Sequence, residues 1–187
     1  MNQGKVILLN GTSSSGKSTL AKALQEALDE PFLHVDGDFF WQLYPERFFA
    51  AKSDAEYQPW RRQFLPACYR TIATFADDGL NVIVDEVLTK PMTLTWLQKA
   101  LADIDVVFVG LHCNLIELER RERLRGNRKL GLARFQFPNI HIHGSYDIEV
   151  HTDVDNPQAC ALQIKQQMAL GRTFDSFRQA KERPLPS

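Results

Sequence analysis

The stretch GTSSSGKS, residues 11–18, constrains the fold of this chain more than any other. It matches the pattern G-x-x-x-x-G-K-[ST], and it lies between an apolar run at 6–9 and helix-spaced apolar positions over 17–28. A strand, a glycine-rich turn and a helix in this order direct successive main-chain N–H groups toward one point. The helix N-terminus adds a partial positive charge there. We therefore expect an α/β protein with a cradle for nucleotide phosphates.

Two side chains of this stretch have individual roles in such a cradle. Lys17 is expected to reach the β- and γ-phosphates of ATP, and Ser18 to ligate Mg²⁺. The alternative is a serine-rich turn without a ligand, which the agreement of motif and context disfavours. The nucleotide-binding candidates are Gly11, Thr12, Ser13, Ser14, Ser15, Gly16, Lys17, Ser18 and Thr19.

Apolar runs and helix-patterned segments alternate along the chain. Further strands are predicted at 31–35, 81–87, 105–111 and 146–150, and further helices at 60–76, 91–101, 114–124 and 157–168. Pro66 is expected to kink its helix or restart it. The tail after Gly171 is either one more helix at a subunit contact or irregular chain. Strands that are nearly all apolar are typical of a parallel sheet buried on both faces. We expect one domain over 1–187 with a five-stranded parallel sheet and helices on both faces.

Acidic residues follow two of the predicted strands. Asp85 fits the position that holds the magnesium shell, and Glu86 is expected to bind substrate or position a nucleophile. Asp36 and Asp38 follow the second strand, and ligands of parallel sheets bind at such strand ends. One of these two aspartates is expected to accept the proton of a substrate hydroxyl group. The simpler interpretations are a helix cap for this pair and a solvated strand end for the other.

Aromatic residues are concentrated in the region of about 38–60. Phe39, Phe40 and Trp41 are expected to bind the substrate, because aromatic side chains can wall a pocket for a partly apolar ring. The alternative is a core beneath a long loop, which is the more frequent role of aromatic residues at this density.

A cation-rich segment over about 120–138 is predicted to form a short lid. Arg125 and Arg128 lie three residues apart and are expected to contact the transferring phosphoryl group. Gly126 and Gly131 would let the segment close and exclude water. The alternative is a solvated helix, whose arginines pair with Glu117, Glu119 and Glu122.

Composition excludes several kinds of function. The net charge of -1 gives no general attraction to nucleic acid or to a membrane surface, and no segment approaches the length of a membrane span. The three cysteines are far apart and lack a CxxC pair, which favours a reduced, cytoplasmic setting over disulfides or zinc. His141 and His143 lack a third convergent ligand. The adenine is expected near 152–156, and the oligomeric state stays open.

The ordered set of motifs resembles the chloramphenicol phosphotransferase-like family, P-loop kinases related in fold to shikimate and adenylate kinases. The matching stretches are ILLNGTSSSGKS, DFFWQLYP, VIVDEV, VFVGLHC, ERRERLRGNRKLGLA and H-x-x-x-x-YDIEV-x-T, and they span most of residues 6–152. The resemblance implies a three-layer P-loop kinase fold with a short arginine-rich lid. It also implies ATP-dependent phosphorylation of a hydroxyl-bearing small molecule, chloramphenicol or a related antibiotic.

The resemblance also assigns residues. The presumed base of the family, seven residues before a proline, falls on Asp38, and its lid arginines fall on Arg125 and Arg128. Phe39 stands where the family has serine, and Asn127 stands where the lid has aspartate. These departures bear on the acceptor rather than on phosphoryl transfer.

Three other functions remain as alternatives. The first is a nucleotide hydrolase or switch in which Glu86 positions water, although the chain lacks the N-K-x-D pattern of a guanine reader. The second is a kinase acting on a sugar nucleotide, as the related zeta toxins do. The third is an ATP-binding module without catalysis, which would not require Asp38.

Overall fold

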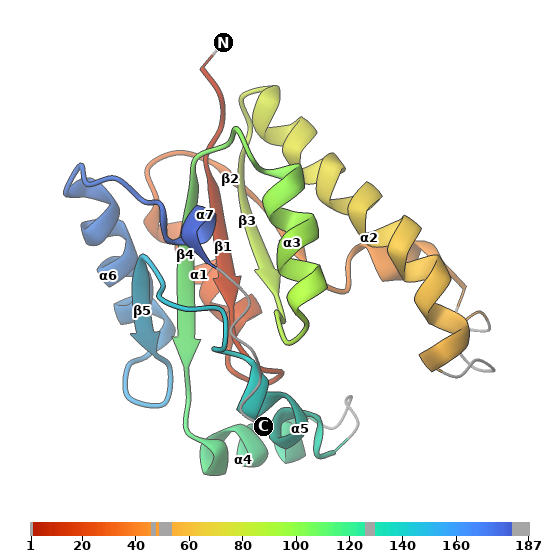
Figure 1. The fold of residues 1–187 in the computed structure, drawn as a ribbon. Helices are drawn as coiled ribbons and strands as arrows, with labels where there is room; N and C mark the ends of the chain where they lie inside the picture. Colours follow the sequence, from red (N-terminus) through yellow and green to blue (C-terminus); the bar gives the residue numbers. More distant parts are fainter. Residues whose placement is uncertain (1, 46–47, 49–53, 126–129, 181–187) are drawn as a thin grey trace.

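The sheet has five strands, all parallel, in the order β2-β3-β1-β4-β5. A computed structural model describes residues 2–45, 48, 54–125 and 130–180 (Figure 1). The strands are β1 Val6–Asn10, β2 Phe32–Asp36, β3 Asn81–Glu86, β4 Val106–His112 and β5 Ile148–His151. The predicted parallel α/β fold is therefore confirmed, and β1, which leads into the glycine-rich turn, lies at its centre.

Helices cover both faces of this sheet. The α-helices are α1 Lys17–Ala27, α2 Asp54–Asp77, α3 Pro91–Ala100, α4 Leu115–Arg125, α5 Leu132–Gln136, α6 Pro157–Ala169 and α7 Ser176–Gln179, and 3-10 turns span Phe40–Leu43 and Phe137–Asn139. One core joins the sheet to α2, α3 and α7, and a second core joins it to α1 and α6. Figure 1 shows these layers, with α4 and α5 below the carboxyl ends of the strands.

The alternation of side chains along β1 explains the two cores. Val6 and Leu8 face α2 and α3, whereas Ile7 and Leu9 face α1, and all four are fully buried. A strand that is buried on both sides has a continuous run of apolar residues. This is why the sequence predicts β1 so clearly.

The largest difference from the sequence-based prediction is α2. It begins at Asp54, not near Trp60, and it continues as one helix through Pro59 and Pro66. The predicted restart at Pro66 is therefore wrong. Leu65 and Tyr69, on either side of that proline, are buried in the main core, and this packing favours the helix across the lost main-chain hydrogen bond.

The tail after Gly171 also has a defined place. Ser176–Gln179 form α7, and Phe177 is only 1% exposed in the core shared with α2 and α3. Asp147 tethers this segment, because its carboxylate accepts hydrogen bonds from the main-chain N–H groups of Ser176 and Phe108. The segment over 176–180 thus packs against the sheet of its own chain. Among the described residues, no helix has both the length and the apolar character that crossing a membrane requires.

Candidate active site

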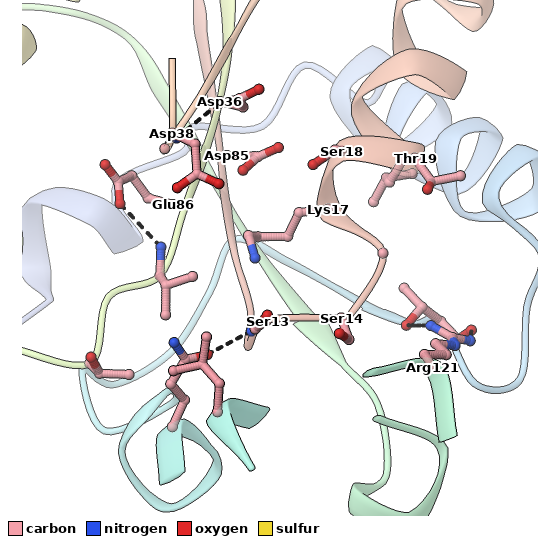
Figure 2. A pocket seen from close by; sticks show the side chains of 18 of the residues that line it. Ser13, Ser14, Lys17, Ser18, Thr19, Asp36, Asp38, Asp85, Glu86 and Arg121 are labelled. Carbon is pink, nitrogen blue, oxygen red and sulfur yellow. Dashed lines mark hydrogen bonds between the residues drawn. The ribbon is translucent and has the colours of Figure 1, made fainter. Parts of the chain in front are cut away.

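A cavity of about 860 Å³ lies at the carboxyl ends of the strands. Its wall combines the glycine-rich turn, the ends of β2 and β3, α2, the start of α3, α4, α5 and the loop after β5. Figure 2 shows this arrangement at close range. Most of the predicted site residues lie on it: Ser13, Ser14, Gly16, Lys17, Ser18, Thr19, Asp36, Asp38, Trp41, Asp85, Glu86 and Arg125. Gly11, Thr12 and Ser15 lie behind this surface, in the same turn.

The glycine-rich turn has the backbone geometry of an anion cradle. Gly16, just before α1, has φ 92°, and Ser14 has φ 65°, so both residues are left-handed. A Cβ on Gly11 would lie 2.6 Å from the Ser15 Oγ, so glycine is needed there too. The buried Lys17 side chain folds over the turn and donates to the carbonyls of Gly11 and Thr12, at 3.0 Å each.

Two hydroxyl groups of the turn are buried without a hydrogen-bond partner in the described part of the chain. They belong to Ser14 and Ser15. Buried polar atoms are normally satisfied, so the turn offers hydrogen-bonding capacity to an additional polar group. A phosphate chain, with many acceptor oxygens, fits this capacity.

Asp85 is held as a carboxylate beside this turn. Burial opposes its ionisation, but hydrogen bonds from His34 and Ser18 and the charge of Lys17 together lower its pKa below the usual value. The His34 Nε2 lies 3.1 Å from the Asp85 Oδ2. Sequence reasoning missed His34. The available signal was alternation, because His34 and Asp36 lie two apart on β2, and Asp36 is the register partner of Asp85.

Glu86 has a different environment from its neighbour Asp85. The Tyr69 hydroxyl of α2 donates to its Oε1 at 3.2 Å, and the main-chain N–H of Val87 donates to its Oε2 at the same distance. Burial nevertheless raises the pKa of Glu86 to about 7. The cavity thus holds one firmly ionised and one easily protonated carboxyl group on adjacent residues.

The two aspartates after β2 divide their roles. The Asp36 Oδ1 accepts the main-chain N–H of Asp38 at 2.8 Å, which closes a turn. The alternative of a helix cap is not seen, because the short helix Phe40–Leu43 begins after Phe39 without a side-chain cap. Figure 2 shows the Asp38 carboxylate on the cavity, on the same side as Asp85 and near the Lys17 side chain.

The aromatic region supplies one residue to the cavity wall rather than three. Of the candidates, Trp41 lines the cavity; Phe39 is 47% exposed outside it, and Phe40 packs on the main core. The other rings mostly contact one another, as in the stacked pair Trp60 and Phe64 with centroids 4.4 Å apart. This aromatic cluster is therefore a half-buried group of rings, of which Phe40, Trp41 and Phe64 pack against the main core.

Two arginines of α4 reach the cavity. Arg125 lines it from the end of the helix, and Arg128, the other predicted lid residue, lies outside the described residues. Arg121, which the sequence did not single out, also lines the cavity, and its guanidinium donates to Glu117 at 2.7 Å and to the Thr152 carbonyl at 2.5 Å. Thr152 in turn donates to the Ser15 carbonyl at 2.7 Å, so the loop after β5 is tied to the glycine-rich turn.

The described part of the predicted lid segment, α4 and α5, is held together by buried polar contacts. Glu122 is 2% exposed, and its carboxylate accepts the main-chain N–H groups of Gly131 at 2.6 Å and Ala133 at 3.0 Å. Its partners are thus main-chain groups, whereas sequence reasoning paired it with arginines. The alternative of glutamate–arginine ion pairs does hold for Glu117, which pairs with Arg120 and Arg121.

Two further contacts join the lid region to the sheet. The Gln136 Oε1, from α5, accepts the main-chain N–H of Ser13 at 2.7 Å. The fully buried Asn10 donates to the Ile140 carbonyl and the Tyr146 hydroxyl, and it accepts from the N–H of Leu88. Asn10 therefore joins β1, the segment between α5 and β5, and the loop after β3.

The histidines near the lid have structural partners. His141 hydrogen-bonds the Tyr146 hydroxyl at 2.7 Å, and burial lowers its pKa to about 4, so its ring is neutral. His143 donates to the Leu88 carbonyl. Over the described ranges, no three residues among His, Cys, Asp and Glu are grouped so that they could hold a metal ion.

Comparison with known sequences gives one family and two relatives. Residues 4–169 match the family described as chloramphenicol phosphotransferase-like protein. The curated relatives are the "Putative O-phosphotransferase" proteins Rv2636 and MT2714, from two strains of Mycobacterium tuberculosis. Each is 35% identical to this chain, in a match that covers 81% of this chain and 76% of the relative.

Solved structures with the same fold are more distant in sequence. APS kinase CysC of Mycobacterium tuberculosis, in complex with AMPPNP and APS, has a TM-score of 0.68 at 20% identity, over 90% of this chain and 99% of that one. A tunicamycin resistance protein of Deinococcus radiodurans has a TM-score of 0.67 at 19% identity, over 92% and 98%. A gluconokinase of Sinorhizobium meliloti has a TM-score of 0.59 at 21% identity, over 96% and 94%.

Proposed function

Because this chain belongs to the chloramphenicol phosphotransferase-like family and is a phosphotransferase of the kinase type, we propose that it transfers the γ-phosphate of ATP to a hydroxyl group of a small molecule. One observation carries the proposal: the glycine-rich turn, the Lys17 side chain and the carboxylates of Asp38 and Asp85 share one cavity. A phosphate donor and a base for an alcohol are the two requirements of this reaction.

The donor site is the glycine-rich turn. Its left-handed Gly16, its buried Lys17 and the unpartnered hydroxyl group of Ser14, which lines the cavity, are what a triphosphate requires. The AMPPNP complex of the similar APS kinase fold is consistent with ATP as donor. Adenine is proposed to lie near the loop over 152–156, where Thr152, Asp155 and Asn156 line the cavity.

Magnesium is proposed to lie between Ser18 and Asp85. Mg²⁺ prefers one or two protein oxygen ligands and completes its shell with water and substrate phosphates. A hydroxyl group beside a carboxylate that stays ionised meets this preference. Bound there, the ion would neutralise charge on the transferring phosphoryl group.

Asp38 is proposed as the general base, as the family resemblance implies. Its carboxylate would accept the proton of the acceptor hydroxyl while that oxygen attacks phosphorus. Asp36 supports it, because the turn closed by the Asp36 Oδ1 sets the direction of Asp38. Arg125 would stabilise the transferring group from the lid, which we propose spans about 120–138 and excludes water.

The test is phosphoryl transfer from labelled Mg-ATP to a panel of alcohols. The panel includes chloramphenicol, nucleosides, sugars and shikimate, since the antibiotic is one candidate acceptor. Labelled product from an alcohol supports the proposal. Release of inorganic phosphate alone, at the same rate with and without every alcohol, would contradict it and favour a hydrolase.

A matched pair of substitutions tests the base. Asp38→Asn removes the charge and should lower transfer by about 10²-fold or more, while ATP binding changes little. Asp36→Asn keeps the Oδ1 that accepts the Asp38 N–H, so transfer should stay within a few-fold of the parent. Calorimetry of ATP binding and single-turnover transfer separate the two effects. Equal transfer by both variants would rule out Asp38 as the base.

A further inference from the structure

Arg61 lies on the cavity wall without an acidic partner in the described part of the chain. It is a half-buried residue of α2, and no ion pair or hydrogen bond to its guanidinium is formed there. Its one described contact is with Trp41, whose ring centre lies 5.7 Å from the Arg61 Cζ. Partial removal of a cation from water is unfavourable unless an anion compensates it.

Other arginines of the chain show the usual arrangement. Arg120 and Arg121 pair with Glu117, and Arg134 pairs with Glu119, all at 2.6–2.7 Å. Those three are satisfied within the protein, whereas Arg61 faces the cavity. Because Arg61 lines the cavity and has no carboxylate partner among the described residues, an anionic ligand in the cavity can pair with it.

Lys90 adds a second cation to the same wall. It stands at the start of α3, lines the cavity and forms no ion pair among the described residues. The first turn of α3 contains no acidic residue that could neutralise it. Figure 1 shows α2 and α3 together on one face of the sheet, away from α6 and β5.

Three acidic residues of the cavity wall, Asp36, Asp85 and Glu86, have hydrogen-bond partners of their own. Asp36 accepts the N–H of Asp38, and Asp85 binds His34. Glu86 accepts hydrogen bonds from the Tyr69 hydroxyl group and from the main-chain N–H of Val87. None of these three is within ion-pair distance of Arg61, which therefore stays available to a ligand.

We propose that the acceptor carries an oxyanionic group in addition to its hydroxyl group, and that Arg61, assisted by Lys90, binds that group. This inference rests on the proposed kinase function and specifies its substrate class. A guanidinium offers paired N–H donors that match a carboxylate or phosphate. Arg61 thereby becomes the specificity-determining residue, and it places the hydroxyl relative to Asp38 without entering the reaction itself.

The experiment compares acceptors that differ only in the anionic group. Three pairs serve: gluconate with sorbitol, shikimate with its methyl ester, and AMP with adenosine. Binding is followed by calorimetry with the donor site filled by a non-hydrolysable ATP analogue, and transfer is followed with labelled ATP. We expect the charged member of a pair to bind more tightly by about 10-fold or more, the scale of one charge-assisted hydrogen bond. The first two pairs test whether the site binds a carboxylate, and the third pair tests whether it binds a phosphate.

Three variants assign the effect to the residue. Arg61→Gln should raise KM for the charged acceptor by about 10- to 100-fold and leave kcat within a few-fold, because the anion binds equally in the ground and transition states. Arg61→Lys should recover part of the loss. Arg62→Gln is the matched control, since Arg62 is the exposed neighbour on α2 and does not line the cavity.

The outcomes separate this inference from the proposed function. Equal binding of charged and neutral members, or equal KM for the parent and Arg61→Gln, overturns the inference and leaves transfer to a neutral alcohol intact. Absence of binding by every charged member likewise overturns it. Failure of the ATP analogue itself to bind overturns the proposed function, and the inference falls with it.

Discussion

Asp85 and Glu86 are adjacent in β3, yet their carboxyl groups have opposite environments. The alternation of a strand directs Asp85 toward Ser18 of α1 and His34 of β2, which stabilise its charge, and Glu86 toward Tyr69 of α2. The pKa is lowered for the first and raised to about 7 for the second. Two acidic residues of the same strand end are thus suited to different tasks.

The raised pKa of Glu86 predicts a pH-dependent stability difference. From about pH 4.5 to about pH 7 the folded protein retains a proton that the unfolded chain releases, so rising pH lowers the free energy of unfolding. Glu86→Gln cannot ionise and lacks this loss. The melting temperature of the variant, relative to the parent, should therefore rise by several degrees from acidic to neutral pH.

Thermal unfolding of both proteins across this pH range is the measurement. The groups that face Glu86 are Tyr69 on α2, Asp85 on β3 and Lys17 on α1, and all are retained in the variant. The difference between the two curves therefore isolates Glu86. Parallel curves would show that the pKa of Glu86 is close to that of a free glutamate.

Sequence patterns predicted those cavity residues whose position in the fold is set locally. Lys17 and Ser18 follow from a motif, and Asp85 follows from its place at a strand end. His34, Arg61 and Gln136 could not be found in this way. Each contacts a residue that is distant in sequence, such as Asp85, Trp41 or Ser13, and only the fold brings these partners together.

At the scale of elements, α4 and α5 are held together by one buried carboxylate. Glu122 of α4 accepts two main-chain N–H groups at the start of α5, and Gln136 of the same short helix reaches the N–H of Ser13. A five-residue helix is too short to be stable alone. Its position therefore depends on these contacts.

Glu122→Ala should loosen α5. It leaves the N–H groups of Gly131 and Ala133 without their acceptor, at a cost of about 1–3 kcal/mol. Amide hydrogen exchange over 131–136 should accelerate by about 10-fold or more, while exchange in β1 is unchanged. Glu122→Gln keeps one acceptor oxygen and should lie between the two. Unaltered exchange in Glu122→Ala would exclude this role.

The start of α2 shows why element boundaries are difficult to predict. Tyr57, Trp60 and Phe64 pack their rings against Tyr44 and Phe48 of the preceding loop. These contacts join the helix to a segment that has no periodic pattern of its own. The apolar pattern predicts a helix only after Pro59. In the structure the helix begins earlier, at Asp54, because the aromatic contacts stabilise its first turns.

At the scale of the whole molecule, the C-terminal segment belongs to the main core. Phe177 packs on Phe108 of β4, with ring centroids 5.8 Å apart, although the surrounding sequence is polar. Phe174, Phe177 and Ala180 are too few to give a clear periodic pattern among polar residues, so the sequence left this segment undecided. The parallel sheet itself was predictable, but its strand order was not, because order depends on how crossovers pack.

Phe177→Ala should destabilise the fold by about 3–5 kcal/mol, since it removes a fully buried ring. Phe135→Ala is the matched control: its ring is 76% exposed, and the change should stay within about 0.5 kcal/mol. Denaturant unfolding of the two variants and the parent measures both values. A Phe177→Ala effect as small as that of the control would mean that α7 does not contribute to the core.

The strand order has a consequence for how such a chain diversifies. β2 and β3 lie on one side of β1, with Asp38 and Glu86 at their ends, whereas β4 and β5 lie on the other side and lead into α4 and the loop at Thr152. Inherited changes confined to α2 and the first turn of α3 can therefore alter selectivity while the glycine-rich turn remains as it is. After gene duplication, one copy could acquire a new acceptor through substitutions on the β2–β3 side of the sheet, while the other side is conserved.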